Sequence, residues 1–296
     1  MDPALILGAF GVGIVVGLTG MGGGALMTPM LVLLFGVNPL TAVSSDLVAS
    51  AVMKPFGGFV HLRHRTVNLR LVGLLCLGSV PAAFCGVILL EALGDDTAVQ
   101  TALSYGLGGA LLLTSLLLGV RAYLRFRSRG RADATGSVPA HGAQVALRPV
   151  PTVLLGAAGG LLVGVTSVGS GSLIIIGLMA LYPALKTGQL VGTDLVQAVP
   201  LVASAAISHA LFGDVDLVIT LPLLIGSIPG TVVGAMLSSR LPSGIIRGAL
   251  TVVLLASGLK LLGAPNPAIV AVVVVALVVA PILWVRMRRR AAEPEG

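Results

Sequence analysis

Long runs of apolar residues constrain this chain more than any other feature of its sequence. Seven runs have about 20 residues each, the length that an α-helix needs to cross roughly 30 Å of hydrocarbon. They cover approximately 40–61, 69–90, 100–120, 190–211, 216–237, 243–262 and 267–285. Charged residues make up only 10% of the 296 residues, against about 25% in soluble domains. The sequence therefore predicts an all-α polytopic membrane protein and excludes soluble, disordered and nucleic-acid-binding classes.

Two further apolar regions are interrupted by small residues. Region 4–36 is broken by glycines at 20–24, and region 150–182 is broken by glycines and serines at 168–172. Each half has about 11 to 17 residues, which is short for a full crossing. Non-helical backbone at membrane depth is tolerated only where it is buried in protein or lines a watery cavity. We expect each region to form a re-entrant hairpin whose tip lies inside the protein.

The placement of the basic residues predicts the orientation in the membrane. Sixteen of the eighteen Lys and Arg residues fall on one side if the loop after the first full span is cytoplasmic. Lys and Arg concentrate in cytoplasmic loops, so this side is the inside of a bacterial-type inner membrane. The Arg-rich stretch 121–149 and the basic C-terminus are then cytoplasmic, and the N-terminus is outside.

The chain resembles itself at an offset of 147 to 148 residues. Four blocks of the first half match four blocks of the second. At the breaks, Gly17-Leu18-Thr19 with Gly22 and Gly24 matches Gly164-Val165-Thr166 with Gly169 and Gly171. The other matches are Asp46-Leu47-Val48 with Asp194-Leu195-Val196, His61 with His209, and Gly78-Ser79-Val80-Pro81 with Gly226-Ser227-Ile228-Pro229. Each repeat holds one hairpin and three crossings, an odd number, so the repeats are inverted. We expect a first repeat at 1–120, a cytoplasmic linker at 121–149, a second repeat at 150–262, and an extra transmembrane helix with a basic tail at 263–296.

Inverted repeats with interrupted helices at matching places are typical of secondary transporters. Their substrate site lies near the midplane, at the interface between the repeats. The sequence therefore predicts a transporter that works by alternating access. An anion channel of the same architecture remains open, because it would differ in rate and coupling rather than in sequence.

Three stretches also resemble a known family. They are GLTGMGGG at 17–24, SDLVASAVMKPFGGFVHLRHRTVN at 45–68 and GTDLVQAVPLVASAAISHALFGDVD at 192–216. With these stretches the chain resembles the sulfite exporter TauE/SafE family of anion transporters. The resemblance implies export of a small sulfur-containing or carboxylated anion, such as sulfite, sulfoacetate or a related organosulfonate.

The two breaks are the first candidate for the substrate site. A helix that begins inside the protein presents unpaired N–H groups and a positive dipole end to an anion. Close packing of small residues between helices is the alternative. The candidate substrate-binding residues at the breaks are Thr19, Gly20, Gly22, Gly23, Gly24, Thr166, Ser167, Gly169, Ser170 and Gly171.

Lys54 is the strongest single candidate for anion attraction or gating. A Lys inside an apolar helix costs about 2.5–3.5 kcal/mol on insertion scales and therefore faces a cavity or a partner. The alternatives are an ion pair with Asp46 or snorkelling to the membrane surface. Gln197, one turn after Asp194, adds an amide donor to the candidate site.

Two pairs of residues at equivalent positions are candidates for coupling or gating. Asp46 and Asp194 are expected either to carry protons or to cap helix N-termini. His61 and His209 are expected either to carry a proton or bind an oxyanion, or to bond carbonyls at a helix end. Protons are thus a candidate coupling ion.

An intramembrane serine protease is a weak rival from another class. It would use Ser170 or Ser172 with His209, and neither the repeat nor the first glycine break would then have a purpose. We expect no enzyme activity, cofactor, metal or nucleic-acid partner, and the oligomeric state stays open.

Overall fold

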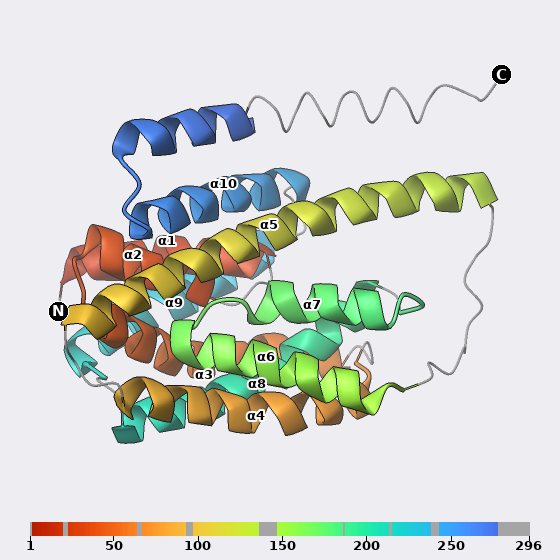
Figure 1. Cartoon of the computed structure of the whole chain (residues 1–296), viewed down its shortest axis with the longest axis horizontal. Helices are drawn as coiled ribbons and strands as arrows, with labels where there is room; N and C mark the ends of the chain where they lie inside the picture. The colour runs from red at the N-terminus through yellow and green to blue at the C-terminus, as the bar shows by residue number, and fades with distance from the viewer. Residues whose placement is uncertain are drawn as a thin grey trace.

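The structure, a computed structural model, describes residues 2–19, 23–63, 67–92, 97–135, 147–185, 187–212, 215–237 and 243–277. Within them the chain is helical, with no strand. The labelled helices are α1 (Pro3–Thr19), α2 (Gly24–Leu34), α3 (Pro39–Arg63), α4 (Leu69–Ala92), α5 (Thr97–Thr135), α6 (Pro149–Thr166), α7 (Ser170–Leu181), α8 (Thr187–Phe212), α9 (Leu217–Leu237) and α10 (Ser243–Leu261). A further helix, Asn266–Leu277, lies beyond α10 in Figure 1.

Five helices within the described residues are long and apolar enough to cross a membrane: Leu69–Leu90, Thr97–Ala122, Pro149–Thr166, Gly188–Phe212 and Leu217–Leu237. They confirm a polytopic, all-helical membrane protein. The predicted span 40–61 lies in α3, whose serines, Asp46 and Lys54 lower its hydropathy below that of the five. The predicted span 243–262 corresponds to α10, and the described part of the predicted span 267–285 lies in the helix Asn266–Leu277.

The two apolar regions that are broken by small residues have arms close to the expected 11 to 17 residues. In the second region α6 has 18 residues, enough for a span, whereas α7 has 12. In the first region α1 has 17 residues and α2 has 11. Each region therefore consists of a long first arm and a short second arm.

The helices pair across the two halves of the chain. α1 packs along α9, and α4 packs along α6, so the long first arm of each half lies against the other half. α3 packs against α8, and α5 packs against α10. Figure 1 shows α5 and α10 along one side of the bundle and α4 along the other.

Glycines allow the closest of these pairings. A Cβ added to Gly78 of α4 would overlap backbone atoms of Val153 in α6, and one added to Gly226 of α9 would overlap the carbonyl oxygen of Ile6 in α1. Gly78 and Gly226 are the first residues of the repeated Gly-Ser-x-Pro block. The block therefore recurs because each copy lets a helix lie directly on the backbone of an arm from the other half.

α5 is longer than the apolar run predicts. The run ends at 120 and the linker was expected from 121, but the helix continues without a break to Thr135. Residues 121–135 contain Arg, Ala and Leu, which favour helices, and no proline. As a result Arg121, expected in a cytoplasmic loop, is a buried residue of α5 with 6% of its surface exposed. The far end of α5 projects beyond the other helices in Figure 1.

The close contact of α4 with α6 yields a first prediction. A Cβ at Gly160 would overlap the backbone of Ser79, whereas one at Gly109 of α5 would meet nothing within 4 Å. We expect Gly160→Ala to lower the free energy of unfolding in detergent by about 1–3 kcal/mol, because two backbones must separate. Gly109→Ala is the matched control and should leave stability unchanged or raise it slightly, since alanine favours helix. Equal thermal midpoints for the two variants would contradict the packing described.

Candidate functional site

The two breaks touch each other at the centre of the bundle. A Cβ added to Gly24, the first residue of α2, would overlap the carbonyl oxygen and the hydroxyl of Ser167, which follows α6. Ser167 and Gly169 both have left-handed backbone, with φ of 57° and 109°. These two residues turn the chain sharply between α6 and α7, so that the second break reaches the start of α2.

Asp46 of α3 is held by two hydroxyl groups, one from the second break and one from α2, the helix that follows the first break. Its Oδ2 accepts hydrogen bonds from Ser167 Oγ at 2.6 Å and from Thr28 Oγ1 of α2 at 2.9 Å. Asp46 is 1% exposed, so these bonds replace the water that a carboxylate would otherwise bind. One carboxylate thus joins α2 and α3 of the first half to the break of the second half.

Neither aspartate is an N-cap, and this alternative is wrong. α3 begins at Pro39, and Asn38 caps it by accepting a hydrogen bond from the Leu40 amide at 2.9 Å. Asn before Pro is a strong start signal, which places Asp46 two turns inside the helix. α8 begins at Thr187, so Asp194 is equally far inside.

Asp194 of α8 lies against the start of α7. Its Oδ2 is 3.6 Å from the position that a Cβ would take on Gly171, and its side chain is 3% exposed. Lys54 and Arg121 both interact electrostatically with this carboxylate. Two cations from α3 and α5 therefore converge on a carboxylate beside a helix N-terminus.

Lys54 interacts electrostatically with both aspartates. It is 8% exposed and lies among protein groups. The buried centre therefore contains the cations Lys54 and Arg121 and the anions Asp46 and Asp194, whose formal charges balance. Buried charges are stable only when paired in this way.

Gln197 lies one turn along α8 from Asp194 and is fully buried. Its Oε1 accepts a hydrogen bond from Ser79 Oγ of α4 at 3.2 Å. Its Nε2 makes no hydrogen bond with the described residues, and the same holds for Asp194 Oδ1 and Ser172 Oγ. Three buried polar atoms, one on α7 and two on α8, are thus unsatisfied within the described residues.

His209 is a buried connector between helices. Its Nε2 lies 3.0 Å from the Gly164 carbonyl of α6, and its Nδ1 lies 2.8 Å from Ser44 Oγ of α3. Because a carbonyl only accepts, Nε2 carries the hydrogen, and in the neutral ring Nδ1 accepts from Ser44. Both ring nitrogens are occupied, so His209 does not act as a base for Ser172. The side chain of His61 lies outside the described residues.

The remaining candidates at the breaks differ in their surroundings. Thr19 Oγ1 donates to the Val15 carbonyl at 2.8 Å, and Thr166 Oγ1 donates to the Leu162 carbonyl at 2.6 Å, so both hydroxyls bond their own helices. Gly23 lies beside Asp46 and Ser50. Gly20, Gly22 and the side chain of Ser170 lie outside the described residues.

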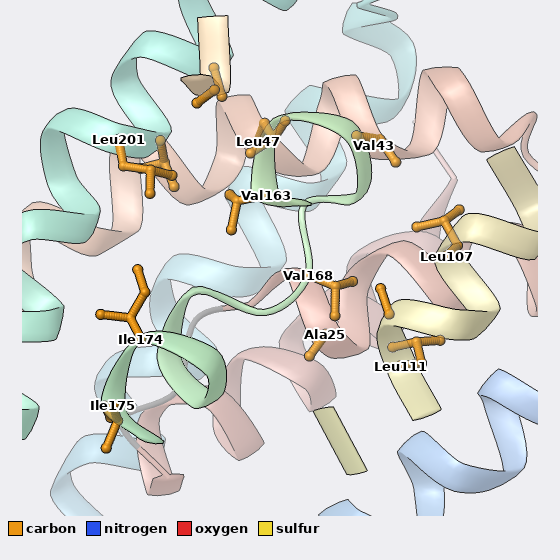
Figure 2. Close-up of a cluster of buried hydrophobic side chains, with 14 of the residues drawn as sticks. Ala25, Val43, Leu47, Leu107, Leu111, Val163, Val168, Ile174, Ile175 and Leu201 are labelled. Atoms are coloured by element: carbon orange, nitrogen blue, oxygen red, sulfur yellow. The ribbon is translucent and has the colours of Figure 1, made fainter. Parts of the chain in front are cut away.

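Apolar side chains enclose the meeting point of the breaks. Figure 2 shows Val168, in the second break, beside Ala25 of α2 and Leu111 of α5. Val168 and Leu111 are fully buried, and Ala25 is 7% exposed. This packing keeps water from the polar groups and strengthens the interactions among their charges.

Three residues of the site were not singled out as binding groups from the sequence. Arg121 was missed because hydropathy ends the span at 120, and Thr28 because one threonine in an apolar run carries no signal. Ser172 was considered only as a nucleophile. Its place in the first turn of α7, next to Gly171, was the available signal.

A helical membrane protein with two interrupted helices meeting around buried charges has the architecture of a membrane transporter. The family model described as "Sulfite exporter TauE/SafE" matches residues 5–261, and the chain belongs to this family. It is thus a member of a transporter family rather than an enzyme.

Two relatives from Bacillus subtilis (strain 168) resemble the chain over nearly their whole length. "Probable membrane transporter protein YjnA" is 37% identical over 263 residues, covering 88% of this chain and 100% of the relative. "Probable membrane transporter protein YdhB" is 28% identical over 259 residues, covering 87% and 99%. No solved structure matches the chain.

The contact between Thr28 and Asp46 can be tested with a double-mutant cycle. Thr28→Val removes the hydroxyl that donates a hydrogen bond to the buried Asp46 carboxylate. Asp46→Asn removes the negative charge that accepts this hydrogen bond. We expect a coupling in the free energy of unfolding of about 1.5–3 kcal/mol, as for a hydrogen bond to a charged group. Thr220→Val is the control, because Thr220 is equally buried but donates to the Asp216 carbonyl near the start of its own helix. Additive effects of Thr28→Val and Asp46→Asn would disprove the contact.

Proposed function

We propose that this chain is a proton-coupled secondary transporter that exports a small oxyanion. The observation that carries the proposal is the meeting of both helix breaks at a buried cluster of balanced charges. The description of the matching family as a sulfite exporter supports a sulfur-containing anion. We propose sulfite, sulfoacetate or a related sulfonate. The alternative is an anion channel of the same architecture.

Several groups of the cluster favour an anion as ligand. The N-terminus of α7 offers backbone N–H groups without helical partners. Lys54 and Arg121 add two cations in a region from which water is excluded. These groups can replace the hydration shell of an oxyanion, which is the main cost of moving it into the bilayer.

The balance of charges supports coupling to protons. Two cations and two carboxylates leave no net charge, so an entering anion adds an uncompensated negative charge in a low dielectric. Protonation of Asp46 or Asp194 removes that excess. One proton moving with each anion would keep the buried centre neutral throughout the cycle.

The pairing of helices supports two inverted repeats, each with a re-entrant hairpin. Exchanging α1–α5 with α6–α10 converts the contact of α1 with α9 into that of α6 with α4, and it leaves the pairs α3–α8 and α5–α10 unchanged. Such a two-fold relation permits alternating access by rocking of one repeat against the other. We place the protein in a bacterial-type inner membrane, with residues 121–149 and the C-terminus in the cytoplasm and the N-terminus outside.

Uptake into proteoliposomes tests the function. The panel contains labelled sulfite, sulfate, sulfoacetate, taurine and short carboxylates, each with and without a proton gradient. We expect saturable transport of sulfite or a sulfonate that a proton gradient accelerates. Flux that does not saturate and ignores the gradient would favour a channel, and no flux of any anion would contradict the proposal.

Lys54 should determine the affinity for the anion. Lys54→Met keeps most of the side-chain volume and removes the charge, so we expect the apparent KM to rise about tenfold or more. Lys260→Met is the matched control, because Lys260 is exposed and donates to Asn266 Oδ1 at 2.8 Å. Transport by Lys54→Met with the KM of the parent protein would show that Lys54 does not attract the anion.

A further inference from the structure

The polar groups around Asp46 and Asp194 differ, although the two residues occupy equivalent places in the repeats. Oδ2 of Asp46 already accepts two hydrogen bonds, from Thr28 and Ser167. Asp194 Oδ1 is buried and makes no hydrogen bond with the described residues. Asp46 is therefore occupied by hydroxyl donors within the protein, whereas Asp194 has an acceptor left open.

Two open hydrogen-bonding groups lie next to Asp194. Ser172 Oγ belongs to the first turn of α7, immediately after Gly171, whose Cβ position is 3.6 Å from Asp194 Oδ2. Gln197 interacts with the Asp194 carboxylate, but its Nε2 does not reach hydrogen-bonding geometry with any described group. Ser172 is 1% exposed and Gln197 is fully buried, so bulk water does not satisfy them.

The first repeat lacks both of these polar groups. The offset of 147 to 148 residues places Ala25 opposite Ser172 and Ala49 opposite Gln197. Both alanines are buried. A set of open polar groups of this kind is thus built once, beside Asp194, on an otherwise two-fold scaffold.

The chemistry of the open groups selects the ligand. Gln197 Nε2, the Ser172 hydroxyl and the N–H groups of α7 can donate to anion oxygens. An ionised carboxylate oxygen only accepts, so one hydrogen must lie between Asp194 Oδ1 and the anion oxygen that faces it. A fully deprotonated anion would put two acceptors against each other there, at a high cost in a buried site.

We propose that Asp194, Ser172 and Gln197 bind the anion in its monoprotonated form, with the hydrogen shared between an anion oxygen and Asp194 Oδ1. The idea rests on the proposed function and deepens it, since the coupled proton then enters and leaves on the same site as the anion. No bond other than this O–H bond forms or breaks. The specificity is for a hydrogen-oxyanion with at least two further acceptor oxygens.

The charged and titratable groups around Asp194 are few. Lys54 lies on α3 and Arg121 lies on α5, and both interact with Asp194. Asp46, also on α3, interacts with Lys54. α4 contributes Cys76, whose thiol lies 3.9 Å from the Gln197 carbonyl oxygen. α6 and α7 contain no titratable side chain. Asp194 is thus the carboxylate of the cluster that both faces two cations and has an open oxygen.

Two isosteric probes test the shared hydrogen. Hydrogensulfite and methanesulfinate carry the same charge and the same pair of oxygens, but a methyl group replaces the hydroxyl group in the second. We expect methanesulfinate to compete with labelled sulfite at least about tenfold more weakly than unlabelled hydrogensulfite does, as for a lost hydrogen bond to a charged group. In Asp194→Asn this discrimination should fall to within severalfold, because a neutral amide tolerates the methyl group.

Variants at the other positions separate binding from discrimination. Ser172→Ala and Gln197→Ala install the residue type of the first repeat, and each should weaken sulfite binding about tenfold while keeping the preference for hydrogensulfite. Ser115→Ala is the control, since Ser115 is buried but donates to the Thr251 carbonyl between α5 and α10. Binding by Ser115→Ala should equal that of the parent.

The proposal is overturned if the parent protein binds methanesulfinate as tightly as hydrogensulfite, or if Asp194→Asn binds sulfite and keeps the full discrimination. Should Asp194→Asn fail to fold, unchanged sulfite binding by both Ser172→Ala and Gln197→Ala overturns it. These outcomes leave anion transport standing. The proposed function fails separately, when the parent transports no anion of the panel.

Discussion

Much of this structure depends on one carboxylate that joins α2 to the turn between α6 and α7. Asp46 accepts hydroxyl groups from Thr28, near the start of α2, and from Ser167, in the turn between α6 and α7. An ionised carboxylate without such donors would be very costly to bury, so the breaks must meet for the charge to be tolerated. Their meeting in turn positions the first turn of α7 beside Asp194. The hydrogen bonds that allow Asp46 to be buried therefore also position the site around Asp194.

The buried cluster of charges contains both fully hydrogen-bonded side chains and side chains with unsatisfied polar atoms. On the Asp46 side the hydroxyl groups of Thr28 and Ser167 donate to the carboxylate. His209 joins α8 to α3 and α6 with both ring nitrogens occupied. On the Asp194 side three polar atoms have no hydrogen-bond partner among the described residues. Buried polar groups in folded proteins are nearly always satisfied, so a group of exceptions marks a place where function rather than stability sets the arrangement. Under the proposed function, the two sides of the cluster therefore have different tasks.

The sequence predicts the coarse plan well because hydropathy and glycine content report on the membrane directly. The apolar runs, the breaks at 20–24 and 168–172, and the repeated Gly-Ser-x-Pro block all locate features that the structure contains. The sequence does not predict which side chains contact each other, because these contacts depend on which helices pack together. Arg121 looks like a loop residue until α5 is seen to continue past it, and Thr28 gains a role only when α2 meets α3. Asp46 was expected as a possible cap because Ser precedes it, but Asn38 and Pro39 had already started the helix.

The exchange of arms between the halves also constrains how the chain is made. α6 meets its partner α4 soon after synthesis, since the two are neighbours in sequence apart from α5. α1 emerges first, yet its partner α9 follows roughly 200 residues later, so the Gly13 and Gly17 surface that fits α9 stays uncovered for most of translation. Two corresponding helix pairs, α4 with α6 and α1 with α9, thus form at very different times, and α1, the first helix made, is among the last to meet its partner.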